Sequence, residues 1–92
     1  MEYRVPGQNK VKLGVHLVRE KGGGVRIKAV GKNSNAQTAG MIPGDLLVSM
    51  DGQALSKVDD VMELLGHKNY DDRSIFQLER DNQILTVEVV FK

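Results

Sequence analysis

The sequence predicts an α+β fold, in which a small antiparallel sheet of five or six strands forms a partly open β-barrel or sandwich and carries two helices. Three observations lead to this prediction. Apolar and polar residues alternate in several short segments, as in strands with one covered face. One segment has apolar residues at helical spacing. The links between strands are short enough for hairpins. The 92 residues suit a single domain, so we expect one domain over residues 1–92.

The composition excludes several classes of function. The chain has no cysteine and two histidines far apart, which removes thiolate chemistry and disfavours a metal site. None of the serines lies in a G-x-S-x-G motif, and a net charge of +1 argues against nucleic acid as the main partner. No apolar run approaches the roughly 20 residues of a membrane span, and the N-terminus lacks the apolar stretch of a signal peptide. We therefore expect a cytoplasmic monomer without catalytic residues, metal or cofactor.

The N-terminal part of the chain predicts two extended segments. Residues 3–5 form a short one that Pro6-Gly7 ends. Strict alternation over residues 13–18 predicts a strand. One face of that strand would carry Leu13, Val15 and Leu17, and the other would carry Gly14, His16 and Val18.

The middle of the chain predicts two further strands and a short helical turn. The glycines of residues 22–24 suit a tight turn, and strand character resumes over residues 25–30. Residues 36–41 fit a helical turn that ends near Gly40. The nearly continuous apolar run of residues 46–50 is typical of a strand covered on both faces.

The clearest predicted helix follows the Asp51-Gly52 turn. Ser56 is a good N-cap residue, and Asp59 would complete a capping box with it. Gly66 supplies the C-terminal stop. The apolar residues at helical spacing are Val58, Val61, Met62, Leu64 and Leu65.

The C-terminal end predicts a hairpin. Residues 75–80 and 84–91 are rich in strand-forming residues, and Asp81-Asn82 joins them. The predicted order of elements is therefore three strands, a short helix, a strand, a helix and two strands.

The segment over residues 12–15, Lys-Leu-Gly-Val, is the most informative candidate for a binding site. An apolar-Gly-apolar step at the start of a strand leaves consecutive backbone N–H groups free to converge on an anion, and a peptide carboxylate suits such a nest.

Four segments, in order and spacing, resemble a PDZ domain over almost the whole chain. Residues 12–15 are similar to the G-L-G-F loop that binds carboxylates in this family, and residues 35–41 to its S-P-A-x-x-A-G-L segment. Residues 42–52 resemble its Gly-Asp pair, hydrophobic strand and Asn/Asp-Gly turn, and residues 58–65 its groove helix.

The chain departs from the family pattern at several positions. Lys12 replaces the first glycine of the loop, Val15 its aromatic residue, and Asn35 a frequent proline. The hairpin over residues 78–87 resembles the HtrA-type, protease-associated branch, whereas the extended residues 3–5 resemble the free-standing signalling branch.

The resemblance implies a module that binds the C-terminal tail of a protein partner as an added strand between the second strand and the second helix. The first groove position of the helix is Val58, which cannot form a side-chain hydrogen bond, so we expect ligands that are apolar at the last and third-last positions. The ordinary alternative is that Val58 and Met62 belong to the core. The resemblance implies peptide-binding roles for Lys12, Leu13, Gly14, Val15, His16, Leu17, Val18, Val58, Met62 and Leu65.

Two other functions stay open at this point. The chain could be the regulatory or substrate-binding domain of a larger protease, or an adaptor for anionic membrane lipids. His16 is either a surface histidine or a contact to a ligand beside its strand. The lipid hypothesis depends on six cations near the first hairpin, which are Lys10, Lys12, Arg19, Lys21, Arg26 and Lys28.

Overall fold

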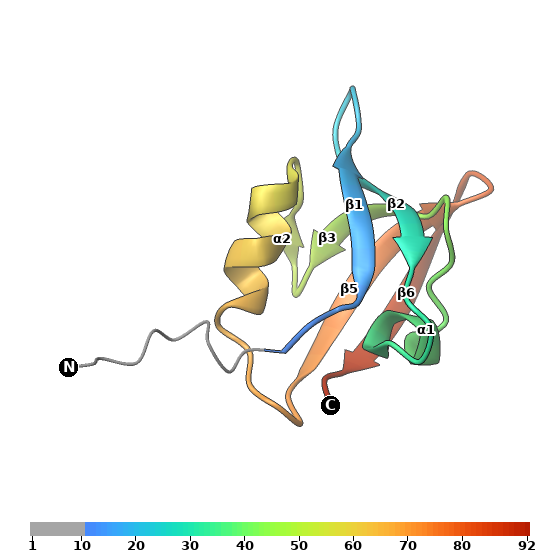
Figure 1. Ribbon diagram of the computed structural model, residues 1–92. Coiled ribbons are helices and arrows are strands. Elements are labelled where there is room, and N and C mark those ends of the chain that lie inside the picture. The colour runs from blue at the N-terminus through green and yellow to red at the C-terminus, as the bar shows by residue number, and fades with distance from the viewer. Residues whose placement is uncertain (1–10) are drawn as a thin grey trace.

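The computed structural model describes residues 11–92 and contains six strands and two helices in that range (Figure 1). The extended piece expected at residues 3–5 lies outside the described residues. The strands are β1 (Val15–Arg19), β2 (Val25–Val30), β3 (Leu46–Met50), β4 (Gln53–Ala54), β5 (Arg73–Arg80) and β6 (Gln83–Val90). The helices are α1 (Asn35–Ala39) and α2 (Val58–Leu65).

The strands form one antiparallel sheet in the order β1-β2-β3-β5-β6, with β4 paired to β3. Within the described residues β1 and β6 are therefore the edges of the sheet. Helix α2 lies beside β1, and α1 packs against β6 (Figure 1). This open antiparallel sheet with two helices confirms the predicted fold class.

Two tight turns follow directly from the local sequence. Asp51 and Gly52 both have positive φ, of 51° and 83°, and so do Asp81 and Asn82, at 54° and 65°. Positive φ at both central residues is the type I′ geometry that matches the twist of a hairpin. The sequence did not predict β4, because its two residues are exposed and too few to show an alternation.

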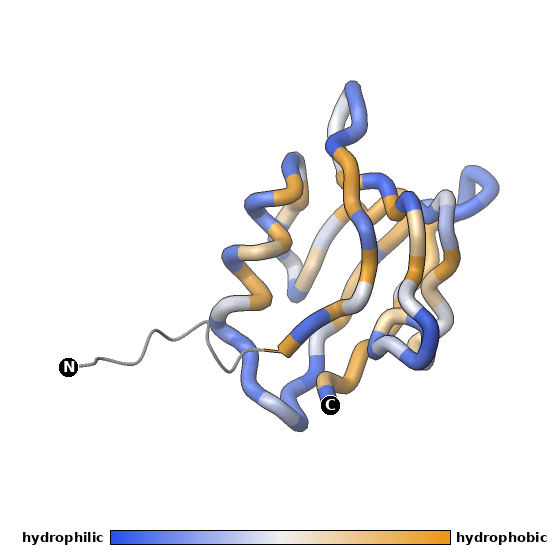
Figure 2. Tube along the Cα trace, in the orientation of Figure 1, coloured by the Kyte–Doolittle hydropathy of each residue, from blue (hydrophilic) through white to orange (hydrophobic). Residues whose placement is uncertain are grey.

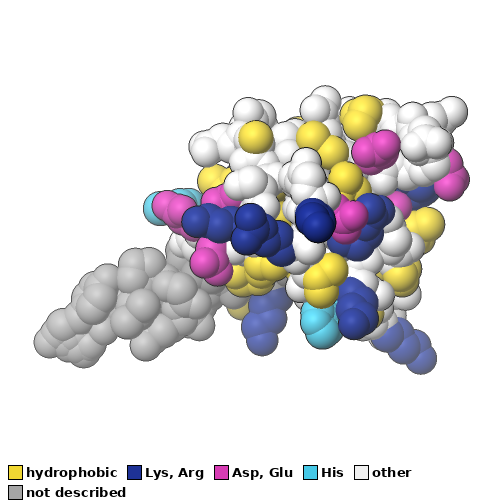
Figure 3. All heavy atoms as spheres, turned by 90° about the horizontal axis from the view of Figure 1, so that it is seen from above, with side chains coloured by type: hydrophobic (Ala, Val, Ile, Leu, Met, Phe, Trp, Pro, Cys, Tyr) yellow, Lys and Arg dark blue, Asp and Glu magenta, His cyan; other side chains and the backbone are white. Residues whose placement is uncertain are grey.

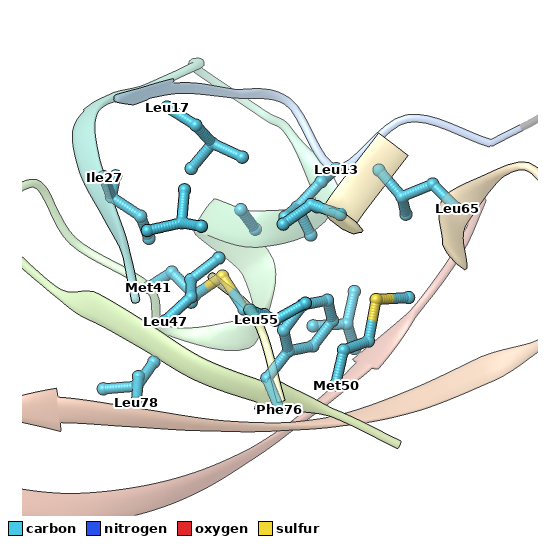
Figure 4. Close-up of a cluster of buried hydrophobic side chains, with 14 of the residues drawn as sticks. Leu13, Leu17, Ile27, Met41, Leu47, Met50, Leu55, Leu65, Phe76 and Leu78 are labelled. Carbon is cyan, nitrogen blue, oxygen red and sulfur yellow. The ribbon is translucent and has the colours of Figure 1, made fainter. Parts of the chain in front are cut away.

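The core is closed by apolar side chains from every strand except β4, from both helices and from the loops between them. Phe76 of β5 and Phe91, directly after β6, are fully buried, and Met50 of β3 belongs to the same cluster. Figure 4 shows Leu13 and Leu65 on the side of this cluster opposite Leu78. The same core that holds the sheet together therefore also supports the segment before β1 and the end of α2.

The N-terminal cap of α2 differs from the prediction. The helix begins one residue later, with Lys57 as its N-cap, and the acidic partner is Asp60 rather than Asp59. The Asp60 carboxylate accepts hydrogen bonds from the N–H groups of Ser56 and Lys57 at 2.9 and 3.2 Å, and from the Ser56 hydroxyl at 2.9 Å. The bonds from the Ser56 N–H and hydroxyl lower the pKa of Asp60. Lysine has no side-chain acceptor, so the carboxylate at the third helical position supplies the cap.

An ion pair between a buried carboxylate and a half-buried guanidinium joins the loop before β3 to the end of β5. Asp45 is 1% exposed, and its carboxylate accepts two hydrogen bonds from the Arg80 guanidinium, at 2.7 and 2.8 Å. It also accepts one from the Ile42 N–H at 3.0 Å. Burial by itself would raise the pKa of Asp45, but these hydrogen bonds outweigh burial and hold the pKa below its ordinary value.

Candidate functional site

A groove of about 710 Å³ runs between β1 and α2. Figure 1 shows the two elements side by side, with the segment before β1 at one end of the space between them. The groove is predominantly apolar. Hydrophobic residues recur among hydrophilic ones along both β1 and α2 (Figure 2). It is lined by Val11, Lys12, Leu13, Gly14, Val15, His16, Leu17, Ala29, Val30, Gly31, Met62, Leu65 and Gly66.

The wall of the groove on the sheet side is an open strand edge. The Gly31 N–H donates to the Gly14 carbonyl at 2.8 Å, so these two residues form a hydrogen-bonded pair. Hydrogen-bonded and non-bonded pairs alternate in an antiparallel ladder. The next pair, Val15 with Val30, therefore turns its backbone groups away from the ladder, and those of Val15 point to the groove. With a period of two, the backbone of Leu17 points the same way.

The loop at the end of the groove presents backbone N–H groups. The carbonyls of Leu13 and Gly14 are occupied, because they accept from the N–H groups of Ala36 at 3.0 Å and Gly31 at 2.8 Å. Among residues 11–92, by contrast, no acceptor is found for the N–H groups of Leu13 and Gly14. Gly14 has a φ of 86°, a left-handed conformation that turns the chain sharply before β1. Neighbouring N–H groups in such a turn form a concave anion-binding nest.

Contacts to α1 hold this loop in place. The Asn35 side-chain amide donates to the Lys12 carbonyl at 2.8 Å. Ser34 caps α1 by accepting from the Gln37 N–H at 3.1 Å, and it lies directly against Gly14. The nest is therefore fixed before any ligand binds. Asn35 replaces a proline that is frequent in the family, and its side-chain amide holds the loop through the Lys12 carbonyl.

The floor of the groove is made of leucines. Leu13, Leu17 and Leu65 are buried, at 2%, 9% and 6% exposure, and Val15 is half-buried beside them. Met62 is 52% exposed and forms the rim on the helix side. An apolar ligand side chain that entered here would bury its own surface and that of Met62, whose flexible thioether adapts to different shapes.

The structure brings together most of the residues predicted for the site. Eight line the groove, whereas Val18 and Val58 do not. Val58 lies one turn before Met62 on α2 and is half-buried against the core. The lining residues missed by the sequence are mainly Ala29, Val30 and Gly31, at the end of β2. Only the pairing of β2 with β1 brings them there, and no local pattern marks them.

The cations near the first hairpin do not form one patch. Lys10 lies outside the described residues, and Arg26 pairs with Glu20 at 3.1 Å. Lys and Arg side chains alternate with Asp and Glu on the face seen from above (Figure 3). No helix within residues 11–92 is long and apolar enough to span a bilayer. The structure therefore adds no support to the lipid hypothesis.

The architecture and the spacing of the site match one known family over nearly the whole chain. The profile of the PDZ domain family matches residues 11–90. The chain belongs to the PDZ domain family. A curated relative, a probable periplasmic serine endoprotease DegP-like from Rhizobium meliloti (strain 1021), is 36% identical over 62 residues. The match includes 65% of this chain but only 12% of that protein, and the periplasm of its name differs from the cytoplasmic location expected from the sequence.

Several solved structures share this fold. The HtrA3 PDZ domain bound to a phage-derived ligand (FGRWV) superposes with a TM-score of 0.80 and 20% identity, covering 90% of this chain and 86% of that one. The HtrA-type protease AlgW S227A with a decapeptide superposes with a TM-score of 0.81 and 19% identity, covering 90% of this chain and 29% of that one. An aminopeptidase N family protein from Idiomarina loihiensis superposes with a TM-score of 0.80 and 19% identity, covering 91% of this chain and 14% of that one.

Proposed function

We propose that this PDZ domain is a single, non-catalytic binding domain that takes up the C-terminal tail of a partner protein. The tail adds as a strand between β1 and α2. The observation that carries this proposal is an apolar groove that follows the edge of β1 and ends at the N–H groups of Leu13 and Gly14, which have no acceptor within the described residues.

Each part of the groove has a distinct task in this proposal. Backbone bonds to β1 hold any sequence, because they use only the main chain of the ligand. The N–H groups of the loop bind the terminal carboxylate, and charge-assisted hydrogen bonds of this kind are about twice as strong as neutral ones. The leucine floor receives the last side chain. The HtrA3 PDZ domain and AlgW, whose structures hold peptides, support this assignment by analogy.

Blocking the carboxylate tests the proposal. We expect a short peptide that ends in Val-Ala-Val to bind with a dissociation constant of micromolar order, as suits a small interface. The same peptide with a C-terminal amide should bind about 10- to 100-fold more weakly, because the N–H groups lose a charged acceptor. Fluorescence polarisation with labelled peptides measures both constants. Equal binding of acid and amide would show that the Leu13–Gly14 loop is not the anchor.

The ligand class is a separate part of the proposal. A tail that runs antiparallel to β1 places its third-last residue beside the N-terminal half of α2. Met62 lines the groove there, and Val58 lies one turn before Met62. We therefore propose apolar residues at the last and third-last positions. Histidine at position 58 would offer a hydrogen bond to a hydroxyl group.

Val58→His is expected to shift the ligand class. The wild type should prefer Val-Ala-Val to Ser-Ala-Val, and the variant should narrow or reverse that preference by about one order of magnitude, which is the effect of one satisfied hydrogen bond. A C-terminal peptide array compares the two proteins. Leu64→His, on the side of α2 away from the groove, is the control for nonspecific effects. An unchanged profile in the Val58 variant would remove Val58 from the specificity site.

A protease-associated role is the second candidate, because the relative from Rhizobium meliloti is a probable endoprotease and two of the similar structures are of the HtrA-type protease AlgW. In that role the domain selects substrates for a catalytic domain outside this sequence. Binding of unfolded proteins through internal apolar segments, measured by competition with the Val-Ala-Val peptide, distinguishes this role from the recognition of free C-termini.

A further inference from the structure

We propose that this groove selects an acidic side chain at the penultimate position of its ligand, where His16 and Lys28 receive it. The inference rests on the proposed function and assigns a role to two residues on the outer face of the first hairpin.

The register of an added strand follows from the ends of the groove. A carboxylate held at Leu13 and Gly14 places the last ligand residue beside Val15. The ligand then runs antiparallel to β1, so its penultimate residue lies beside His16 and its fourth-last beside Val18. Residues opposite each other in a sheet point to the same face. Leu17 is buried and His16 is exposed, so the penultimate side chain shares the outer face with His16.

A bulge brings Lys28 to the same place. His16 pairs with Ala29, whereas Leu17 pairs with Ile27, so Lys28 is the extra residue of β2. In a bulge two residues of one strand oppose a single residue of the other. Lys28 therefore lies beside Ala29, opposite His16, and its side chain is exposed.

The ionisable side chains that line the groove near His16 are all basic. The only ionisable residues in the described lining of the groove are Lys12 and His16. Neither of them, nor Lys28, takes part in an ion pair within residues 11–92. The exposed carboxylates of α2, on Asp59 and Glu63, do not line the groove.

The next residue of β1 on the outer face, Val18, has no free cation beside it among the described residues. Val18 is apolar and pairs with Arg26, whose guanidinium is occupied by Glu20 at 3.1 Å and by the Gly44 carbonyl at 2.8 Å. The free positive charge is therefore concentrated at the penultimate residue of the ligand. His16 adds an imidazole N–H that can donate to a carboxylate.

Three peptides that differ only at the penultimate position, Val-Asp-Val, Val-Gln-Val and Val-Lys-Val, test the inference. Exposed ion pairs contribute little, so we expect the Asp peptide to bind about two- to fivefold more tightly than the Lys peptide at low salt. The difference should shrink in about 0.5 M NaCl, where exposed charges are screened. Isothermal titration calorimetry at neutral pH measures the three constants.

Variants separate a local effect from the overall charge. Lys28→Gln and the double variant His16→Gln/Lys28→Gln should reduce the preference of Asp over Lys, the double variant most. Arg73→Gln removes the same charge from β5, which β2 and β3 separate from β1, and should leave the preference intact. Equal binding of the three peptides, or an equal loss in the Arg73 control, would overturn the inference. The Gln peptide would still report the proposed function, and failure of all three peptides to bind would overturn both.

Discussion

Replacement of Arg80 by methionine is expected to destabilise the fold by about 3 kcal/mol, the lower end of the range for a broken buried ion pair. In the wild type Asp45 is 1% exposed, and the variant would leave the Ile42 N–H as the remaining hydrogen-bond donor to its carboxylate within residues 11–92. Methionine retains much of the aliphatic volume of arginine, so the loss reports the ion pair and the hydrogen bond from Arg80 to the Gly40 carbonyl at 2.9 Å rather than the packing.

The loss should depend on pH with a definite sign. In the wild type the pKa of Asp45 is below its ordinary value, so its contribution to stability is present above about pH 4 and is lost as the pH falls through the lowered pKa. Without Arg80, burial dominates and the pKa of Asp45 rises above its ordinary value. The variant should then lose stability as the pH rises from about 4, and the gap from wild type should be smaller at about pH 3 than at pH 7.

Urea unfolding at the two pH values measures this gap. Arg73→Met is the matched control, because its ion pair with Glu88 at 3.2 Å is largely exposed and should contribute less than about 1 kcal/mol. An equal loss in both variants, or a gap that does not change with pH, would contradict the role given to the buried pair.

Gly14→Ala should damage both the fold and the binding site. A Cβ at this position would lie 2.3 Å from the Ser34 Cβ, closer than any real contact, and the φ of 86° is unfavourable for alanine. The left-handed conformation alone costs about 1–2 kcal/mol. Relief of the clash requires the loop to move away from α1, which displaces the N–H groups of the nest. We therefore expect a loss of stability beyond that range and at least a tenfold weaker affinity for a C-terminal peptide.

Gly22→Ala separates the two causes. Gly22 has a similar φ of 98°, but an added Cβ would meet no atom within 4 Å. This control should show the conformational cost alone and should retain peptide binding. Thermal unfolding and fluorescence polarisation of the two variants provide the comparison. Similar losses in both would mean that Ser34 does not constrain the loop.

Much of the fold could be predicted because its signals are local. Alternation identifies the strands, and the I′ turns at Asp51-Gly52 and Asp81-Asn82 need residues that tolerate positive φ. The predicted N-cap of α2 was wrong by one residue, because a helix start is equally compatible with Ser56, Asp59 and Asp60. Only the direction of the Asp60 carboxylate, toward the N–H groups of Ser56 and Lys57, selects it.

Within residues 11–92 the sequence by itself determined the order of the elements apart from β4, and it identified the glycine step at residues 12–15, because turn chemistry and periodicity act over a few neighbouring residues. The tertiary structure decided that β1 lies at an edge beside α2, which turns that step into the end of a groove. It also paired Asp45 with Arg80 and drew Val58 toward the core. These contacts join segments far apart in the chain, and no local pattern records which distant segment will cover a given face.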